Sequence, residues 1–238
     1  MIKEAIQYIV GLSSPHLHTI HNAIYTDKQM SRVMAPCIPA LEVHTLSAIS
    51  EYINRHPDQD IPENLLLHIK NYNEVSLYGP PNIDAIRPLI INAVLQDQRS
   101  LFGKWHDAES FNIILQSCFA PNEHSAAVLK MIGNIADQSV KNLGDDGITQ
   151  QVTVKSGISI LARERVPNPV SLIPYRTFPE AKQPKSLFVL RVRSEHGVEA
   201  ALFEADGGAW KNEAISNIKA YFDTAIEQPK RNVITILG

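Results

Sequence analysis

The sequence predicts an α+β protein: N-terminal helices and a small β-meander, a helical pair, then a mainly antiparallel β-sheet with a closing C-terminal helix. Apolar residues recur at helical spacing in 43–53, 107–142 and 210–222, whereas the runs between 150 and 206 resemble strands. Helices and strands are grouped along the chain and do not alternate as they do in a doubly wound fold. These observations favour the α+β class.

The chain of 238 residues is long enough for one large domain or two small ones, and its 44% hydrophobic and 20% charged residues are typical of globular proteins. We expect an N-terminal helical arm over 1–42, an α/β meander plus helical pair over 43–143, and an antiparallel sheet with terminal helix over 144–238. The sequence leaves open whether the last two segments form one continuous domain. No apolar run approaches the roughly 18 residues that span a bilayer, so no membrane contact is expected.

Local signals place the elements of the N-terminal half. Ser14 as a cap and Pro15 in the first helical position predict a helix over about 15–25. A second helix is expected where apolar residues recur over 43–53. Three short β-like runs between 65 and 95, separated by turn residues, predict the meander.

The C-terminal half begins with the helical pair. Asp107 caps the first helix, over about 107–119, and the second is expected over about 122–142, capped by Asn122 and followed by a turn at 144–147. Beyond this turn the sequence predicts five β-type runs, at about 150–157, 158–166, 170–178, 186–194 and 198–206. A terminal helix stopped by a proline follows over about 207–229, and a last possible strand over 232–238.

One segment, 166–186, holds five prolines in twenty-one residues. Because proline cannot donate a ladder hydrogen bond, we expect an edge strand or an extended arm. The arm can shield a sheet edge of its own chain or lie across a neighbouring subunit. A proline-rich recognition ligand is disfavoured, because the spacing typical of such ligands is absent.

Catalytic signatures are absent from the sequence, which leans against an enzyme and nominates no catalytic residue, metal or cofactor. His16, His18 and His21 lie close together but lack a fourth zinc ligand. Cys37 and Cys118 are far apart and outside any CxxC motif, as expected for reduced thiols in a cytosol.

Two carboxylates near the terminal helix have a structural interpretation. Ala201 and Phe203 are expected to face the core, which places Glu204 and Asp206 on the opposite face of their strand. Trp210, in the first turn of the following helix, is expected to be substantially buried.

Charge is distributed unevenly along the chain. Residues 151–193 contain eight basic and two acidic side chains, net +6, so the rest of this −3 chain carries −9. A strand places Arg191 and Arg193 on one face. A groove for single-stranded nucleic acid, a contact with an acidic surface of another subunit, and a solvated sheet face are the three interpretations. The candidate nucleic-acid- or partner-binding residues are Arg163, Arg165, Arg176, Lys182, Lys185, Arg191 and Arg193.

The stretches "DDGITQQVTVKSG", "VPNPVSLIPYRTFPEAKQP" and "ALFEADGGAWKNEAISNIKAYF" resemble the C-terminal half of a family of uncharacterised phage and prophage proteins. The resemblance extends more loosely over residues 43–238 and carries no catalytic residue. It implies a non-enzymatic accessory protein of the host cell cytoplasm, with nucleic acid or recombination and replication proteins as partners. A self-assembling ring or shell and an anti-defence binding protein are the alternatives. The separated charges and the proline-rich segment also predict a homo-oligomer.

Overall fold

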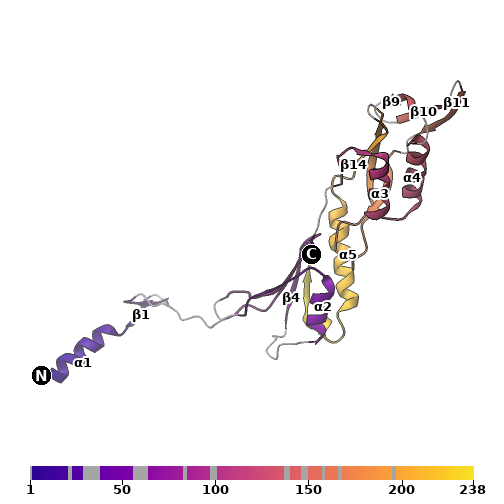
Figure 1. Cartoon of the computed structure of the whole chain (residues 1–238). Coiled ribbons are helices and arrows are strands. Elements are labelled where there is room, and N and C mark those ends of the chain that lie inside the picture. Colours follow the sequence, from indigo (N-terminus) through magenta and orange to yellow (C-terminus); the bar gives the residue numbers. More distant parts are fainter. Residues whose placement is uncertain are drawn as a thin grey trace. The chain divides into compact units, whose positions relative to one another are not determined.

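A computed structural model of the chain describes residues 2–20, 23–28, 38–55, 64–82, 85–96, 101–136, 140–145, 150–156, 159–165, 168–194 and 197–238 (Figure 1). The chain divides into two compact units, Met1–Ile38 and Pro39–Gly238. The sequence left open whether the segments 43–143 and 144–238 form one domain, and both lie in the second unit. The mixed α+β class is confirmed.

The N-terminal unit consists of a helix, α1 (Ile2–Ser13), and a two-stranded antiparallel hairpin, β1 (Leu17–Ile20) with β2 (Ala23–Thr26). The helix predicted over 15–25 is therefore wrong. Cross-strand pairs such as Thr19 with Ile24 use β-branched side chains, which suit a strand better than a helix. His21, the third histidine of the cluster, lies outside the described residues.

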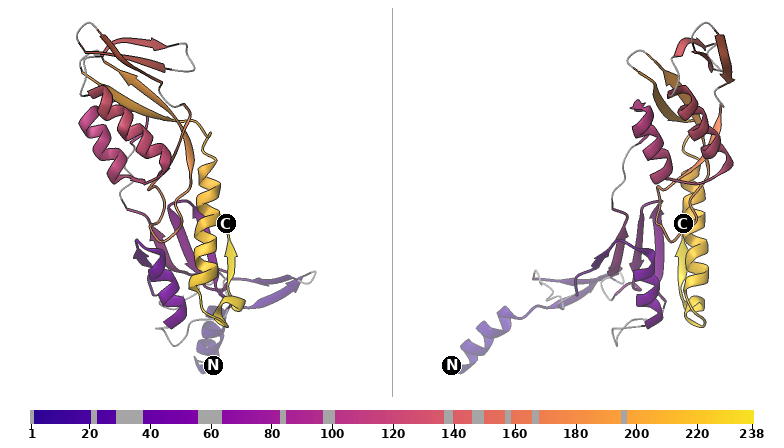
Figure 2. Two further views of the ribbon diagram at one scale, coloured as in Figure 1. Left: turned by 90° about the vertical axis from the view of Figure 1, so that its right-hand side faces the viewer. Right: turned by 45° about the vertical axis from the view of Figure 1, so that its right-hand side comes forward.

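The first sheet of the C-terminal unit has the strand order β15-β4-β5-β6-β3. The predicted meander forms its centre, and the two outer strands join it in parallel register. Two helices, α2 and α5, cover one face (Figure 2). The bounds of these elements are β3 (Leu41–Val43), α2 (Leu46–Arg55), β4 (Leu66–Asn71), β5 (Glu74–Tyr78), β6 (Leu89–Val94), α5 (Trp210–Ala225), the 3₁₀ turn η1 (Lys230–Val233) and β15 (Thr235–Leu237).

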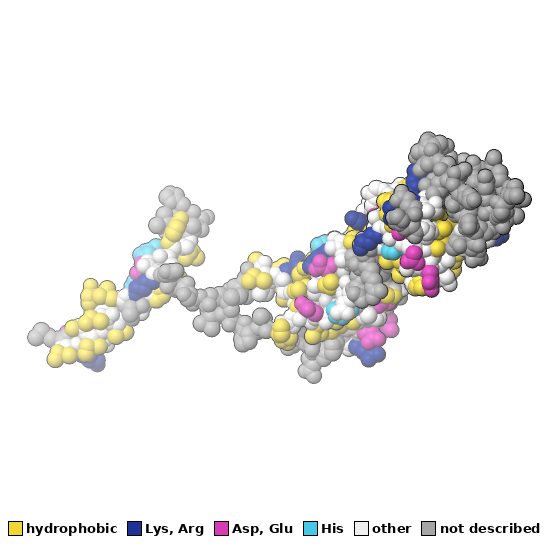
Figure 3. Space-filling view, turned by 45° about the horizontal axis from the view of Figure 1, so that its top comes forward, with side chains coloured by type: hydrophobic (Ala, Val, Ile, Leu, Met, Phe, Trp, Pro, Cys, Tyr) yellow, Lys and Arg dark blue, Asp and Glu magenta, His cyan; other side chains and the backbone are white. Residues whose placement is uncertain are grey.

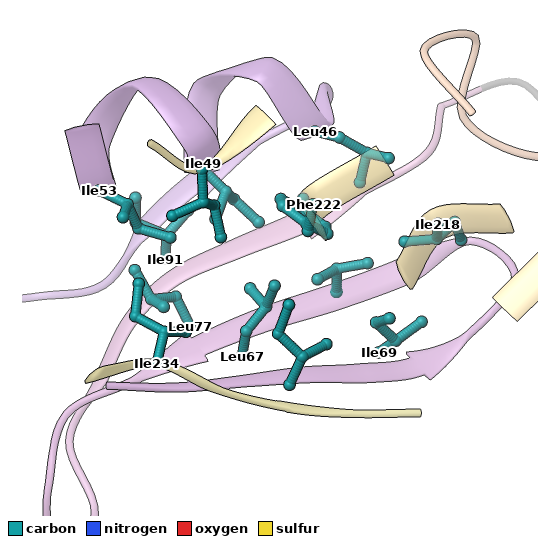
Figure 4. Packing of buried hydrophobic residues seen from close by; sticks show 14 of the residues in the cluster. Leu46, Ile49, Ile53, Leu67, Ile69, Leu77, Ile91, Ile218, Phe222 and Ile234 are labelled. Carbon is teal, nitrogen blue, oxygen red and sulfur yellow. The ribbon is translucent and has the colours of Figure 1, made fainter. Parts of the chain in front are cut away.

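A first hydrophobic core lies between these helices and the sheet. Figure 4 shows side chains of α2 and α5 meeting the inward side chains of the strands. Ile49 and Phe222, one from each helix, are fully buried, as is Leu77 of the central strand. The apolar residues whose spacing predicted both helices are thus residues that the helices pack against the sheet.

The second sheet has the order β7-β14-β13-β12-β8, and the helical pair α3 and α4 packs on one face of it around a second core. A further three-stranded sheet has the order β11-β10-β9. The bounds are β7 (His106–Asp107), α3 (Ala108–Ser117), β8 (Phe119–Ala120), α4 (Glu123–Ala136), β9 (Val140–Asp145), β10 (Gln150–Ser156), β11 (Ser159–Arg165), β12 (Val170–Pro174), β13 (Ser186–Arg193) and β14 (Glu199–Glu204).

The caps predicted for the helical pair are confirmed, but the length of its second helix is not. Asp107 Oδ1 accepts a hydrogen bond from the Ser110 amide at 2.9 Å, and Asn122 Oδ1 accepts one from the Ser125 amide at 2.7 Å. The helix predicted to continue to 142 ends at Ala136, and β9 pairs with β10. The pairing of β9 with β10, the next strand in the sequence, here overrides local helical preference.

The proline-rich segment does not form an edge strand. Its strand β12 pairs with β13 on one side and β8 on the other. Beyond β12 the chain places Phe178, which is fully buried, in the first core, although Leu172 lies in the second. The Gln183 amide closes this turn, since its Oε1 accepts from the Arg176 and Thr177 amides. The proline-rich segment therefore connects the second core, which contains Leu172, with the first core, which contains Phe178.

A carboxylate of the same segment caps a distant helix. Glu180 Oε1 accepts hydrogen bonds from the backbone amides of Leu46 at 3.0 Å and Ser47 at 3.3 Å, at the start of α2. These amides have no partner within the helix, and a negative charge is favoured at a helix N-terminus. The proline-rich segment thereby binds the first half of the chain.

Candidate functional site

The two sequence-predicted arginines of β13 lie on the face of the second sheet opposite to its helices. Phe188, Leu190 and Val192 point into the second core, and the residues between them alternate to the other side. Arg191 and Arg193 therefore share this open face, as predicted. We call this side of β13 and β14 the open face; Ala201 is buried on it, and Arg191 and Arg193 are partly exposed.

Two aromatic side chains lie beside these arginines. In the register of β13 with β14, Val189 is opposite Phe203, which puts Phe203 on the open face with 37% of its surface exposed. The Trp105 ring centroid lies 6.4 Å from that of Phe203 and 4.3 Å from the guanidinium carbon of Arg193. The open face thus combines π surfaces with guanidinium groups.

Sequence reasoning missed Trp105 because nothing in its neighbourhood signals a sheet. It precedes the two-residue strand β7, which joins β14 through the pairing of His106 with Ala200. Only this long-range contact brings Trp105 to the arginines.

An acidic side chain offsets part of the charge. Arg193 Nε donates to Glu199 Oε2 at 2.5 Å, and the two side chains keep 40% and 27% of their surface exposed. Such an exposed pair contributes little to stability, because water screens both partners. Figure 3 shows basic, acidic and apolar side chains interspersed on the side of the molecule that it presents, without a field of one sign.

The other predicted basic residues do not join this face. Lys182 and Lys185 are exposed in the connection between β12 and β13. Arg163 and Arg165 belong to β11, but their side chains lie outside the described part of the structure. Arg176 points into the protein.

Arg176 occupies a cage of aromatic rings. Its guanidinium carbon lies 3.8 Å from the Trp210 ring centroid and 5.7 Å from those of Phe102 and Phe188. Its Nη1 donates to Glu204 Oε1 at 2.5 Å, and its side chain is only 9% exposed. Burial lowers the pKa of Arg176 to about 10, against the opposing effect of Glu204, so the group stays charged at neutral pH.

This contact corrects the expected orientation of the carboxylates. Phe188 is directly opposite Glu204 in the ladder, so Glu204 lies on the side of the sheet that faces the second core. Phe203, expected inside, is on the open face. Ala200 and Leu202 face the second core, and Ala201, directly opposite Arg191 in the ladder, is buried as well, so burial does not alternate over these three residues. The expected burial of Trp210 is confirmed at 6% exposure.

A hollow of about 470 Å³ lies next to the Arg176 cage. Loops and element ends of both sheets line it, including Tyr72, Tyr175, Trp210 and Lys211. Among the residues that the structure describes, no group of three His, Cys, Asp or Glu side chains is arranged to hold a metal ion. No helix in the described part of the chain has the length and apolar character required to cross a membrane.

Comparison of the chain with models of known protein families, with curated proteins and with solved structures gives no match. Within the described residues, the open face and the hollow are the two candidate sites.

Proposed function

We propose that this protein is a non-enzymatic accessory protein that binds single-stranded nucleic acid through the open face of β13 and β14. The observation that carries the proposal is the placement of Trp105 and Phe203 beside Arg191 and Arg193. The resemblance to phage and prophage proteins supports a role in the cytoplasm of an infected host cell.

The chemistry of the open face suits an unpaired strand. Aromatic rings on a sheet accept stacked bases with any sequence, at about 1–3 kcal/mol per base. Arginines next to the rings neutralise the phosphates between those bases. Since the whole chain is slightly acidic, with a net charge of −3, affinity depends on this local arrangement and not on a general attraction.

Replacing Arg191 and Arg193 together by Gln is expected to weaken binding of a fluorescent single-stranded oligonucleotide by at least roughly tenfold, because charge-assisted hydrogen bonds contribute about 1.5–3 kcal/mol each. Each phosphate contact contributes about 0.7 to the slope of log affinity against log salt concentration. The slope should therefore become shallower by about 1.4 in an anisotropy titration.

The matched control replaces Arg55 and Lys130 by Gln, which removes the same charge from exposed positions on α2 and α4. The control should bind almost as the parent protein does. The proposal would be contradicted if both double variants lost the same affinity for the oligonucleotide. It would also be contradicted if the parent protein did not bind the oligonucleotide at low salt.

A second candidate function, self-assembly, is favoured by the N-terminal unit. In α1 the side chains of Ile2, Ile6 and Ile9 are 80%, 56% and 65% exposed and recur at helical spacing. Hydrophobic atoms accordingly cover much of this helix in Figure 3. A helix of 12 residues is marginal in water without a packing partner.

We propose that a second copy of the same unit covers this face. The unit contains Lys3, Lys28 and Arg32 against Glu4 and Asp27, a net charge of only +1, so two copies repel one another weakly. An identical patch on each copy allows a closed two-fold pairing. A lipid surface fits less well, because α1 carries only one basic side chain.

We expect a mass above that of the 26.5 kDa monomer in light scattering at micromolar concentration. Replacing Ile6 and Ile9 by Glu should return the mass to that of the monomer, whereas Gln7→Glu, in the same helix, should not. A monomeric parent protein would exclude self-assembly, and a large closed particle would favour the ring or shell.

A further inference from the structure

The hollow beside Arg176 has the construction of a small-molecule site. Ends of several elements converge on it: the β4–β5 turn with Tyr72, the end of α3 with Cys118, the segment after β12 with Tyr175, and the start of α5 with Trp210. A volume of about 470 Å³ lies within the range of ligand pockets, which are lined by aromatic side chains and a few polar groups.

The charges around the hollow favour an anionic ligand. Glu204 pairs with Arg176 at 2.5 Å, and Asp206, which does not line the hollow, also acts on that guanidinium. Lys211, by contrast, is exposed, and no described carboxylate lies within ion-pair distance of its ammonium group. Of the charged side chains that line the hollow, Arg176 and Lys211 are basic and Glu204 is acidic, so the lining itself carries a net charge of +1.

The aromatic lining favours a planar ligand. The Lys211 ammonium lies 5.8 Å from the Tyr72 ring centroid and 5.9 Å from that of Trp210, so a group bound to it is held near both rings. Tyr175, which lines the hollow, is 56% exposed and supplies a hydroxyl for a polar edge. These groups together fit a heteroaromatic ring joined to an acidic group.

We infer that the hollow binds a nucleotide, with its base against the rings of Tyr72 and Tyr175 and its phosphate at Lys211. The inference goes beyond the proposed strand binding, because Glu204 at the hollow and the open-face arginines lie on opposite sides of the same sheet. The nucleotide is either free in solution or the 5′-phosphorylated end of a strand, since both present the same base and phosphate.

The two tryptophans of the chain separate the two sites, because Trp210 lines the hollow and Trp105 lies on the open face. In Trp105→Phe protein, titration with adenosine monophosphate should quench the remaining Trp210 fluorescence to saturation. Lys211→Gln in that background should weaken binding by roughly tenfold or more, as expected for one charge-assisted contact. Lys130→Gln, which removes a charge from exposed α4, should leave it unchanged.

Two further arms identify the source of the nucleotide. Saturation by adenosine monophosphate alone assigns the hollow to a free nucleotide, and equal or tighter binding of a 5′-phosphorylated oligonucleotide assigns it to a strand end. No saturable quenching by either probe at millimolar concentration, or quenching unaffected by Lys211→Gln, would overturn the inference. Equilibrium dialysis of radiolabelled adenosine monophosphate against the unsubstituted protein repeats the test without any variant. Oligonucleotide binding that depends on Arg191 and Arg193 is measured separately, so either proposal can fail alone.

Discussion

Replacing Trp210 by Ala is expected to lower the free energy of unfolding by about 3–5 kcal/mol, the range for truncation of a large buried aromatic side chain. Trp210 is 6% exposed, and its ring centroid lies 4.7 Å from that of Tyr72. The same ring covers the Arg176 guanidinium at 3.8 Å. The substitution therefore opens a cavity and also removes the closest aromatic partner of a buried charge.

Urea denaturation followed by far-ultraviolet circular dichroism measures this loss. Trp210→Phe is the control, because it keeps a ring near Arg176 and should cost less than half as much as Trp210→Ala. A loss below about 1 kcal/mol for Trp210→Ala, a value ordinary for partly exposed sites, would show that the ring does not hold α5 and the cage together.

Phe178→Ala should also lower the free energy of unfolding by about 3–5 kcal/mol, for a different reason. Phe178 is fully buried in the first core, while its own segment continues from β12 of the second sheet. Thr177, next to it, donates its hydroxyl hydrogen bond to the Tyr72 carbonyl oxygen at 2.5 Å. The loss of Phe178 removes the anchor that holds the proline-rich segment against the first sheet.

Tyr175→Ala is the matched control, since it removes a ring of similar size from the same segment at a position that is 56% exposed. Tyr175→Ala should lower the free energy of unfolding by only about 0.5 kcal/mol, as other surface substitutions do. Similar costs for the two variants would refute the assignment of Phe178 as a buried anchor. The free energy of unfolding of both variants is obtained from the midpoint of urea denaturation, provided that the dependence on urea concentration (the m-value) stays the same.

Local signals in the sequence were sufficient for most elements of the C-terminal unit. The apolar period over 43–53 and over 210–222 predicted α2 and α5, and those residues are the ones that face the first core. The caps Asp107 and Asn122 marked the starts of α3 and α4. Such signals act within one or two turns of the chain, which is why a sequence reveals them.

Predictions failed where the pairing of strands or a tertiary contact decides the structure. The hairpin of β1 and β2 replaced the helix over 15–25, and β9 replaced the end of a helix, because strand pairing overrode local preference. The face predicted for Glu204 was wrong because residues 200–203 are all apolar, so the sequence shows no alternation that would reveal which side chains face the core. Glu180 gave no sign of its role, since the helix that it caps begins 134 residues earlier.

The candidate sites divide in the same way. The alternation of Arg191 and Arg193 in β13 is a property of the sequence by itself, because successive side chains of a strand point to opposite faces. Only the tertiary structure placed Trp105 beside them and enclosed Arg176 in aromatic rings. Burial and ring contacts depend on residues that are distant in the chain, and local periodicity carries no information about which of them meet.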